Sequence, residues 1–537
     1  MTDQRQSAGS TGRHRPRRAE RAEAGRAATP VGAPPVPALE VPASATPELS
    51  IEALPVAGWP DRLQEVRRSE AAVLADLFAG PRFGEGRVAL TMLIARPDRA
   101  GWLALRDVID PKTGFPSLVG DVPAADWYER EALDTHGIHP VGHPHAWSLG
   151  YGPLGGPGAV TSGLPRRAAV PAGVVDYPLG PVRSGIVESG QYRIRTVGEE
   201  IVDVNLQLAY KHRGVEQMLA NVGWPLAPRV AERISGTDAV AHALASSQAL
   251  ERLAGMEPST RASLLRSLFA ELERLYNHVG FEADLCGATG LAVAQAQFEM
   301  LRERLLRLNA RTVGHRYAFG TIVLGGVADD LDDAALADVS ETVGNVRASL
   351  AELGRLVQGS SSHLDRLETT GRLSFRDAVD LAVVGPVARA SGIDVDARRD
   401  HPYAGYGAFR PPVCVRDGGD AAARSLVRLD EALVAADLAI DLVGALAASG
   451  PLPDQPDPSR ASLRPAAVGL GWAEGPRGTE IHWIETDPQG AIARYRVRSA
   501  SFACWQAFAR CVPGDNILTD FPIIEQSFGL SFAGNDR

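Results

Sequence analysis

The spacing of hydrophobic residues divides the chain into a short mixed region and a longer, mostly helical one. From Asp61 to Phe78, apolar side chains recur at helical spacing and predict an amphipathic helix. The residues on its apolar face are Leu63, Val66, Val73, Leu74 and Leu77. Alternation from Val88 to Ile94 predicts a strand, and similar patterns continue to about Leu149. We therefore expect a small α/β domain over residues 56–149.

The second region begins with a strand meander between Ser184 and Leu208. Helical spacing then dominates up to about Ser449, with long segments near residues 227–255, 260–285, 293–312 and 329–366. A strand pair, around Gly478–Ile484 and Ala491–Val497, and a helix near Ser501–Cys511 complete the pattern. The predicted fold class is α+β: the small α/β domain is followed, over residues 177–537, by a large helix bundle with small antiparallel sheets beside it.

Two segments have a different composition. Residues 1–55 combine clustered arginines with Ala, Pro and Ser, offer little apolar area to offset the entropy of ordering, and are expected to form a disordered basic tail. Residues 150–176 are rich in Gly and Pro, a composition typical of an interdomain linker. A literal G-x-G-x-x-G at Gly150, Gly152 and Gly155 falls in this linker, but Pro153 lies inside it and Pro157 follows, so we assign no dinucleotide site there.

Composition narrows the class of protein. The 537 residues are 45% hydrophobic and 22% charged, which is typical of a globular protein with large cores. A formal net charge of −10 argues against a nucleic-acid binder, since that role needs basic surfaces. Four scattered cysteines indicate no disulfide framework. No apolar run approaches the roughly 20 residues that a membrane span needs, so we expect any link to a membrane to come through partner subunits.

Motifs in both regions resemble one known arrangement, in the same order. Residues 126–134, followed by Gly137-Ile138 and Gly142-His143-Pro144, resemble the E-R-E-x-x-D...G-I...G-H-P signature of the C-type subunit of complex I. Residues 210–216 and the E-R-x-x-N-H motif at 273–278 resemble the catalytic subunit of formate hydrogenlyase and the D-type subunit of NADH-quinone oxidoreductase (complex I). The fusion of both domains in one chain is characteristic of the formate hydrogenlyase and hydrogenase-4 group, which are group 4 nickel-iron hydrogenases.

The resemblance also shows what this chain lacks. In the hydrogenase pattern R-x-C-G-x-C and D-P-C-x-x-C, four thiolates hold nickel and iron, a task that hydroxyls and carboxylates perform poorly. The corresponding positions here are Ser235, Asp238, Ser531 and Gly534. The cysteines present (Cys286, Cys414, Cys504 and Cys511) form no C-x-x-C pair and lie elsewhere. We therefore expect no nickel-iron centre and no metal site in this chain.

The resemblance implies that several polar residues converge on one buried cavity near these four positions. They include His212 and Glu216 as a candidate proton relay, and the pocket candidates Arg183, Arg213, Arg233, His242 and Asp536. The alternative is a structural remnant in which Arg213 and Arg233 pair with Glu216 and Asp238. His136, His139, His143 and His145 crowd together, but without a matching ligand frame we favour a structural role for them. Arg183 and Gly236 stand where complex I has its quinone-site histidine and tyrosine, which puts conventional quinone reduction in doubt.

The resemblance finally implies a function. We expect a subunit of a membrane-bound complex I-like or hydrogenase-4-like oxidoreductase, held peripherally on the cytoplasmic face of the cell membrane by its partners. It would bind no cofactor itself and would pack against a ferredoxin-like subunit and an iron-sulfur subunit similar to the B-type subunit of complex I. It would shape the electron-acceptor pocket and pass changes to the membrane arm. The alternatives are a quinone-binding oxidoreductase subunit and a scaffold without redox activity.

Overall fold

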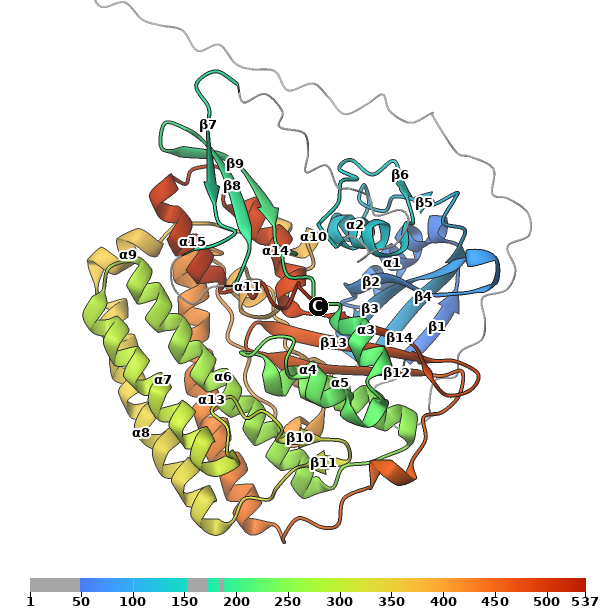
Figure 1. Ribbon diagram of the computed structural model, residues 1–537. Helices are drawn as coiled ribbons and strands as arrows, with labels where there is room; N and C mark the ends of the chain where they lie inside the picture. The colour runs from blue at the N-terminus through green and yellow to red at the C-terminus, as the bar shows by residue number, and fades with distance from the viewer. Residues whose placement is uncertain (1–48, 100, 152–170, 184–187) are drawn as a thin grey trace, which may run out of the picture. The chain divides into compact units, whose positions relative to one another are not determined.

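The computed structural model describes residues 49–537, except residues 100, 152–170 and 184–187. Its first domain is built on a four-stranded sheet with the strand order β1-β4-β3-β2 (Figure 1). These strands are β1 (Leu49–Ala53), β2 (Val73–Arg82), β3 (Val88–Arg96) and β4 (Gly101–Ile109). Helices α1 (Trp59–Ser69) and α2 (Ala125–His136) and the short strands β5 (Phe115–Pro116) and β6 (Pro140–Val141) complete the domain.

Two boundaries in this domain differ from the sequence-based expectation. Leu49–Ala53, which we had placed in the disordered tail, pair in parallel with β4 because their alternating pattern suits a sheet edge. The helix expected up to Phe78 ends at Ser69, and Val73, Leu74 and Leu77 lie on β2. Most of β2 is buried, and a short apolar run of this kind cannot be told from a helix by periodicity alone.

The second domain opens with a three-stranded antiparallel sheet, β7 (Val175–Leu179), β8 (Gln191–Val197) and β9 (Glu200–Gln207). The expected meander is therefore present, and β7 begins within the last two residues of the predicted linker. The core face of β8 consists of Tyr192, Ile194 and Thr196, all buried. Residues 152–170 of that linker lie outside the described residues, as do residues 1–48 of the predicted tail.

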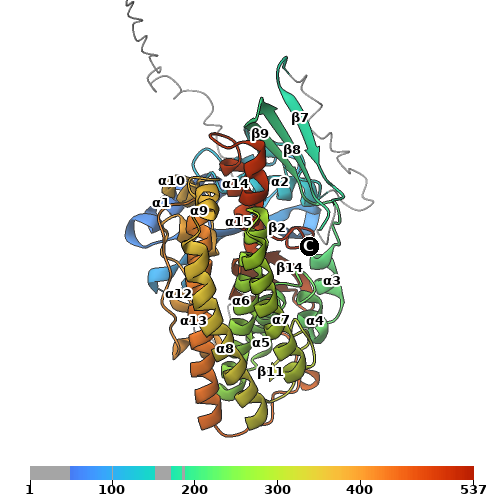
Figure 2. The same cartoon turned by 90° about the vertical axis from the view of Figure 1, so that its left-hand side faces the viewer.

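The bundle contains four long helices, α6 (Thr260–Ala288), α7 (Ala292–Val313), α8 (Asp333–Gln358) and α13 (Ala421–Ala448). They run side by side in both views (Figures 1 and 2). Helix α5 (Ala239–Ala254) packs across the sheet described next. Shorter elements connect them: α3 (Val215–Asn221), α4 (Ala227–Ala231), β10 (Ile322–Val323), β11 (Gly326–Val327), α9 (Ser361–Leu367), α10 (Phe375–Asp380), α11 (Gly385–Ala390) and α12 (Ala397–Asp400).

The C-terminal part forms a second antiparallel sheet, which contains the predicted strand pair and a further strand, β12, that the sequence analysis did not predict. Its strands are β12 (Val468–Gly475), β13 (Gly478–Thr486) and β14 (Ile492–Arg498), followed by α14 (Ala500–Cys511) and α15 (Phe521–Phe528). Gly469 and Gly471 let this sheet approach α5 closely, because an added Cβ would lie about 2 Å (2.2 and 1.9 Å) from carbonyl oxygens of that helix.

The sheets of the two domains contact each other through buried side chains. Phe78 of β2 lies 5.6 Å from Trp483 of β13, and Trp102 of β4 lies 5.3 Å from Trp472 of β12, between ring centroids. Arg106 of β4 forms a buried ion pair with Glu485 at 2.7 Å. This α+β architecture, a small sheet domain followed by a large helical domain with small antiparallel sheets, is the fold class that the sequence predicted.

Candidate functional site

The helical stretch predicted over residues 227–255 is interrupted between α4 and α5, and the first ligand-position motif lies in this break. Helix α5 starts only after Asp238, and the Glu273 carboxylate of α6 accepts the backbone N–H groups of Val240 and Ala241 at 2.8 and 3.0 Å. Glu273 thus satisfies donors that would otherwise be left free at a helix start. Asn277, also on α6, donates to the Thr237 carbonyl at 2.8 Å. The E-R-x-x-N-H motif therefore positions the loop that precedes α5.

Arg213 joins this loop to the segment that follows α15. Its guanidinium donates to the carbonyl oxygens of Arg233 and Ile234 at 2.9 and 2.8 Å, and to those of Ala533 and Asp536 at 2.8 and 3.2 Å. Both segments that carry the ligand-position motifs are consequently held by one side chain. This differs from the expected pairing of Arg213 with Glu216, because every contact made here is to backbone.

A second arginine, which sequence reasoning missed, bridges the same two segments. Arg477 lies in the two-residue turn between β12 and β13 and contacts both carboxylate oxygens of Asp238 at 3.1 Å. It also donates to the Gly529 carbonyl at 2.6 Å. The ion pair lies mostly out of solvent, with 3% of the Asp238 side chain and 17% of the Arg477 side chain exposed. Burial lowers the pKa of Arg477, but the Asp238 charge more than offsets this, so the pKa is raised overall.

The four ligand positions themselves make contacts with one another and with neighbouring groups. Ser235 donates to Asp238 at 2.8 Å, and the Ser531 hydroxyl accepts the Gly534 N–H at 3.1 Å. Gly534 sits where an added Cβ would come within 3.0 Å of the Ser499 hydroxyl. These donors are hydroxyls and a carboxylate already paired with a guanidinium, whereas a nickel-iron centre needs soft thiolates. The residues present do not fit that metal centre.

Two of the predicted pocket residues point elsewhere. Arg183 pairs with Glu525 of α15 at 2.8 Å, and its guanidinium lies 5.4 Å from the Tyr192 ring centroid. Arg233 has 60% of its side chain exposed and lies over the Phe319 ring at 4.4 Å, beside Glu232 at 3.3 Å. The expected convergence of all these groups on one buried cavity is therefore wrong, because Arg183 is held by its own ion pair and Arg233 by an aromatic ring near the surface.

Glu216, on α3, belongs to an interdomain ion network. Arg494 contacts it at 2.8 Å, and Arg496 and Arg537 each at 3.4 Å. Burial raises the pKa of Glu216, but these three guanidiniums outweigh it and hold the pKa below its usual value. A carboxylate held ionised takes up no proton near neutral pH, which argues against Glu216 as a proton relay. The contacts of Glu216 fit the alternative of a structural ion pair better. Its partners are Arg494, Arg496 and Arg537, and not Arg213 or Arg233 as expected.

The same network reaches the first domain. Arg496 contacts Asp76 of β2 at 2.9 Å and Glu131 of α2 at 2.6 Å, and Arg537 contacts Glu131 at 2.7 Å. Glu129 and Arg130, the two residues before Glu131 in the E-R-E motif, make contacts within the first domain. The Glu129 carboxylate accepts the Leu118 N–H at 2.6 Å, and Arg130 donates to the Trp147 carbonyl at 2.9 Å. Glu131 therefore acts at the domain interface.

His212 lines a cavity of about 600 Å³ near this network, together with Glu131, His136, Tyr151 and Arg494. Burial and then the Arg537 charge lower the pKa of His212, so its imidazole is neutral at pH 7. Asp536 lies nearby, with its backbone carbonyl on Arg213, and burial raises the pKa of its carboxyl to about 7. Among the described residues, no group of three or more His, Cys, Asp or Glu side chains has an arrangement able to hold a metal ion, the crowded histidines 136–145 included.

His242 takes part in a hydrogen-bonded chain that sequence reasoning missed. His242 Nδ1 lies 3.2 Å from His482 Nε2, and His482 Nδ1 lies 3.0 Å from the Tyr495 hydroxyl. At the other end, His242 Nε2 lies 3.6 Å from Glu480. Burial lowers the pKa of His242 to about 3, whereas burial and then the Asp238 charge raise the pKa of Glu480 well above its usual value. The hydrogen bonds therefore run from His242 to Tyr495, and the Glu480 carboxyl lies beside His242 beyond hydrogen-bond distance.

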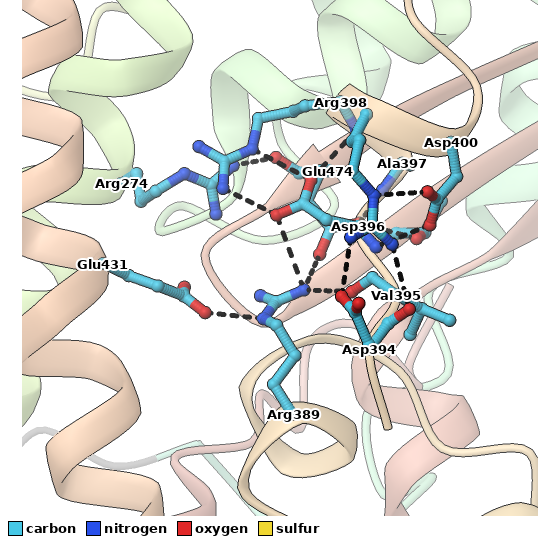
Figure 3. A network of polar contacts seen from close by, with 12 residues as sticks. Arg274, Arg389, Asp394, Val395, Asp396, Ala397, Arg398, Asp400, Glu431 and Glu474 are labelled. Carbon is cyan, nitrogen blue, oxygen red and sulfur yellow. Dashed lines mark hydrogen bonds and ion pairs between the residues drawn. The ribbon is translucent and has the colours of Figure 1, made fainter. Parts of the chain in front are cut away.

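A further buried network ties α6 to β12 (Figure 3). Arg389 contacts Glu431 at 2.6 Å and Glu474 at 2.9 Å. Arg398 contacts Asp396 at 2.6 Å. Arg274, from the E-R-x-x-N-H motif, donates to the Glu474 carbonyl at 2.5 Å. Each arginine here has a carboxylate or carbonyl partner, which is what burial of so many charges requires.

Comparison with known proteins agrees with this architecture. The family model for the 30 kDa subunit of respiratory-chain NADH dehydrogenase matches residues 55–154, and that for its 49 kDa subunit matches residues 287–453. The D-type subunit 2 of NADH-quinone oxidoreductase from Salinispora tropica is 32% identical over 335 residues, which cover 60% of this chain and 84% of that protein. The chain therefore belongs to the family of D-type subunits of NADH-quinone oxidoreductase.

Relatives that match both domains identify a fused C/D-type member of that family. Formate hydrogenlyase subunit 5 of Escherichia coli is 29% identical over 460 residues, covering 81% of this chain and 79% of that protein. The fused C/D subunit of NADH-quinone oxidoreductase from Rhodopseudomonas palustris is 28% identical over 518 residues, covering 82% and 87%. The described helices include none that is both long and apolar enough to cross a membrane.

Proposed function

We propose that this chain is a peripheral subunit of a membrane-bound oxidoreductase complex, related to complex I and hydrogenase-4, that works without a nickel-iron centre of its own. The observation that carries this proposal is the ion pair between Arg477 and Asp238. A carboxylate in the first motif is neutralised by a guanidinium that also binds the second motif through Gly529. The Arg477 charge thus neutralises Asp238, which stands where the nickel-iron hydrogenases have a cysteine thiolate.

We propose its partners by analogy with its relatives. An iron-sulfur subunit resembling the B-type subunit of complex I, a ferredoxin-like subunit and membrane subunits would form the rest of the assembly, and would keep this chain on the inner face of the cell membrane. The chain would form part of the pocket where electrons from the iron-sulfur cluster meet their acceptor. The hydrogen-bonded chain His242–His482–Tyr495, with Glu480 3.6 Å from His242, would be the route by which protonation near Asp238 is passed through the domain.

A quinone is the alternative acceptor, and a scaffold without redox activity is the third possibility. Neither Arg183, which pairs with Glu525, nor Gly236 supplies a proton to a quinone. The scaffold is favoured only if the complex assembles but binds no acceptor.

The test is purification of the complex from membranes through a tag on this chain, followed by metal analysis and electron paramagnetic resonance. We expect iron and sulfide in a smaller co-purifying chain and less than stoichiometric nickel. Stoichiometric nickel that stays with this chain would overturn the proposal. Titration of the same preparation with a short-chain quinone then separates the alternatives: saturable binding supports a quinone pocket, and its absence, with an intact assembly, supports the scaffold.

A further inference from the structure

A cavity of about 480 Å³ lies between the two domains. One wall comes from the end of α1, the start of β2 and Trp102 of β4, and the other from the segment between α10 and α12. Its surface is mostly apolar, with Ala72, Leu74, Ala75, Val379, Val383 and Val384 among the residues that line it. This volume and lining are typical of sites for small apolar ligands.

Two large apolar residues at this cavity are exposed. Phe375 and Val379 of α10 line it and have exposed fractions of 60% and 40%. Large apolar side chains left in contact with water next to a cavity favour a ligand that covers them.

The carboxylates that line the cavity have ion-pair partners, whereas two arginines that line it do not. Each of the five carboxylates has an arginine partner: Glu70 with Arg96, Asp394 and Asp400 with Arg399, Asp396 with Arg398, and Glu474 with Arg389. Figure 3 shows Asp396 beside Arg398 and Glu474 beside Arg389. Two arginines also line the cavity, Arg67 and Arg498. Each donates to a backbone carbonyl, Arg67 to Ala72 and Arg498 to Thr479, and the described residues place no carboxylate within 4 Å of either guanidinium. An anionic ligand would therefore find two arginine charges here that no carboxylate contacts directly.

Two buried donors of the lining residues lack an acceptor. Arg498 is 2% exposed and donates through Nη1 to the Thr479 carbonyl at 2.6 Å, but its Nε–H has no acceptor among the described residues. The indole Nε1–H of Trp102, which is 1% exposed, is likewise unpaired within the described part of the chain. Buried donors without a partner are costly, so a ligand oxygen at this place would be favourable.

We propose that this cavity binds a single-chain amphiphile with a carboxylate head, that is, a fatty acid. Its hydrocarbon chain lies along the apolar wall formed by β2 and α10, and its carboxylate accepts hydrogen bonds from Arg498 and Trp102 and is attracted by Arg67. No covalent step is involved. Because the cavity is lined by both domains, an occupied site strengthens their association.

The test uses the purified full-length chain, freed of lipid and titrated with laurate by calorimetry. The neutral control ligand is dodecanol, which has an alcohol in place of the carboxylate. We expect one laurate per chain, and about tenfold weaker laurate binding for Arg67→Met, with dodecanol binding unchanged. Arg68→Met is the matched control, because Arg68 is the next residue of α1, is exposed and does not line the cavity.

A second variant tests the apolar part. Val379→Trp fills the mouth and should abolish binding of laurate and dodecanol alike, whereas Val293→Trp, at a 76% exposed position of α7, should leave both unchanged. Circular dichroism and the midpoint of thermal unfolding show that each variant is folded. Laurate binding that survives Val379→Trp, equal effects of Arg67→Met and Arg68→Met, or no laurate binding by the folded wild type would each overturn the proposal.

Discussion

Arg477 contacts both carboxylate oxygens of Asp238 at 3.1 Å, although 239 positions separate the two residues in the chain. The arginine comes from a hairpin turn and the aspartate from the loop before α5. The pair fixes the hairpin against the loop that carries the first ligand-position motif. Breaking it leaves a mostly buried charge without its partner.

Replacement of Asp238 by asparagine should destabilise the protein by about 3 kcal/mol, because Arg477 then keeps its charge without a carboxylate. The matched control is Asp437→Asn, which breaks the exposed pair with Arg347 and should cost less than about 1 kcal/mol. Chemical denaturation of the purified chain measures both. The double variant Asp238→Leu with Arg477→Met should recover much of the loss, since no charge is left unpaired. Equal stability of the two single variants would show that the pair contributes nothing.

Arg496→Met should loosen the small domain. This residue is 1% exposed and serves Asp76, Glu131 and Glu216 at once, so its removal leaves buried carboxylates with fewer partners and costs about 3 to 5 kcal/mol. Limited proteolysis should then cleave the chain between the domains faster than in the wild type. Arg311→Met, which breaks an exposed pair with Asp338, is the control and should leave the cleavage rate unchanged. Cleavage at the wild-type rate in Arg496→Met would contradict an anchoring role.

The sequence predicted the domain order and most of the elements because both periodicity and motif spacing are local signals. It also identified Ser235, Asp238, Ser531 and Gly534 as positions without thiolates. The sequence did not predict contacts between residues that are far apart in the chain. Arg477, His482 and Arg496 carry no motif, and their roles depend on how β12, β13 and β14 pack on α5 and β2. The Gly-Pro-Arg-Gly turn at residues 475–478 was the one available signal, since it places Arg477 at a hairpin tip.

The contacts of the predicted pocket residues also depend on residues that are distant in the chain. Arg183 and Arg233 were assigned to the pocket by their place in the motifs, but side-chain direction depends on neighbours such as Glu525 and Phe319. Glu216 is a candidate relay only on the resemblance, which implies that it lies in a buried cavity with His212. Three arginines, two on β14 and one at position 537, hold the pKa of Glu216 low. No sequence pattern predicts these contacts.

Glu273 should make stability depend on pH. Burial and then the Asp238 charge raise its pKa to about 8, so the folded state retains a proton that the unfolded chain loses near its ordinary pKa of 4.5. Its contribution is therefore complete below about pH 4.5 and declines as pH rises to about 8. Glu273→Gln removes this decline. The stability of the variant relative to wild type should rise by up to about 1.4 kcal/mol per pH unit within that window.

The measurement is chemical denaturation of both proteins at several pH values. The free energy of unfolding of the wild type is subtracted from that of the variant, so that the contributions of other titrating groups cancel. Glutamine has one carbonyl oxygen for the N–H groups of Val240 and Ala241, which lowers stability by a constant amount without changing the slope. Glu341→Gln, at an exposed position of α8, is the control. A pH-independent difference for Glu273→Gln would mean that Glu273 is ionised in the folded state.

Glu480 should carry a proton at pH 7, since burial and the Asp238 charge raise its pKa well above the usual value. Infrared spectroscopy detects such a group through the carbonyl stretch of a protonated carboxyl. We expect Glu480→Gln to remove intensity from this band at pH 7. Glu431→Gln should not, because the Arg389 charge and the hydrogen bond from His278 outweigh burial and hold the pKa of Glu431 well below its usual value. If the two variants gave the same spectrum, Glu480 would be ionised, and the chain through His242 to Tyr495 would begin at a fixed negative charge that holds no proton to pass on.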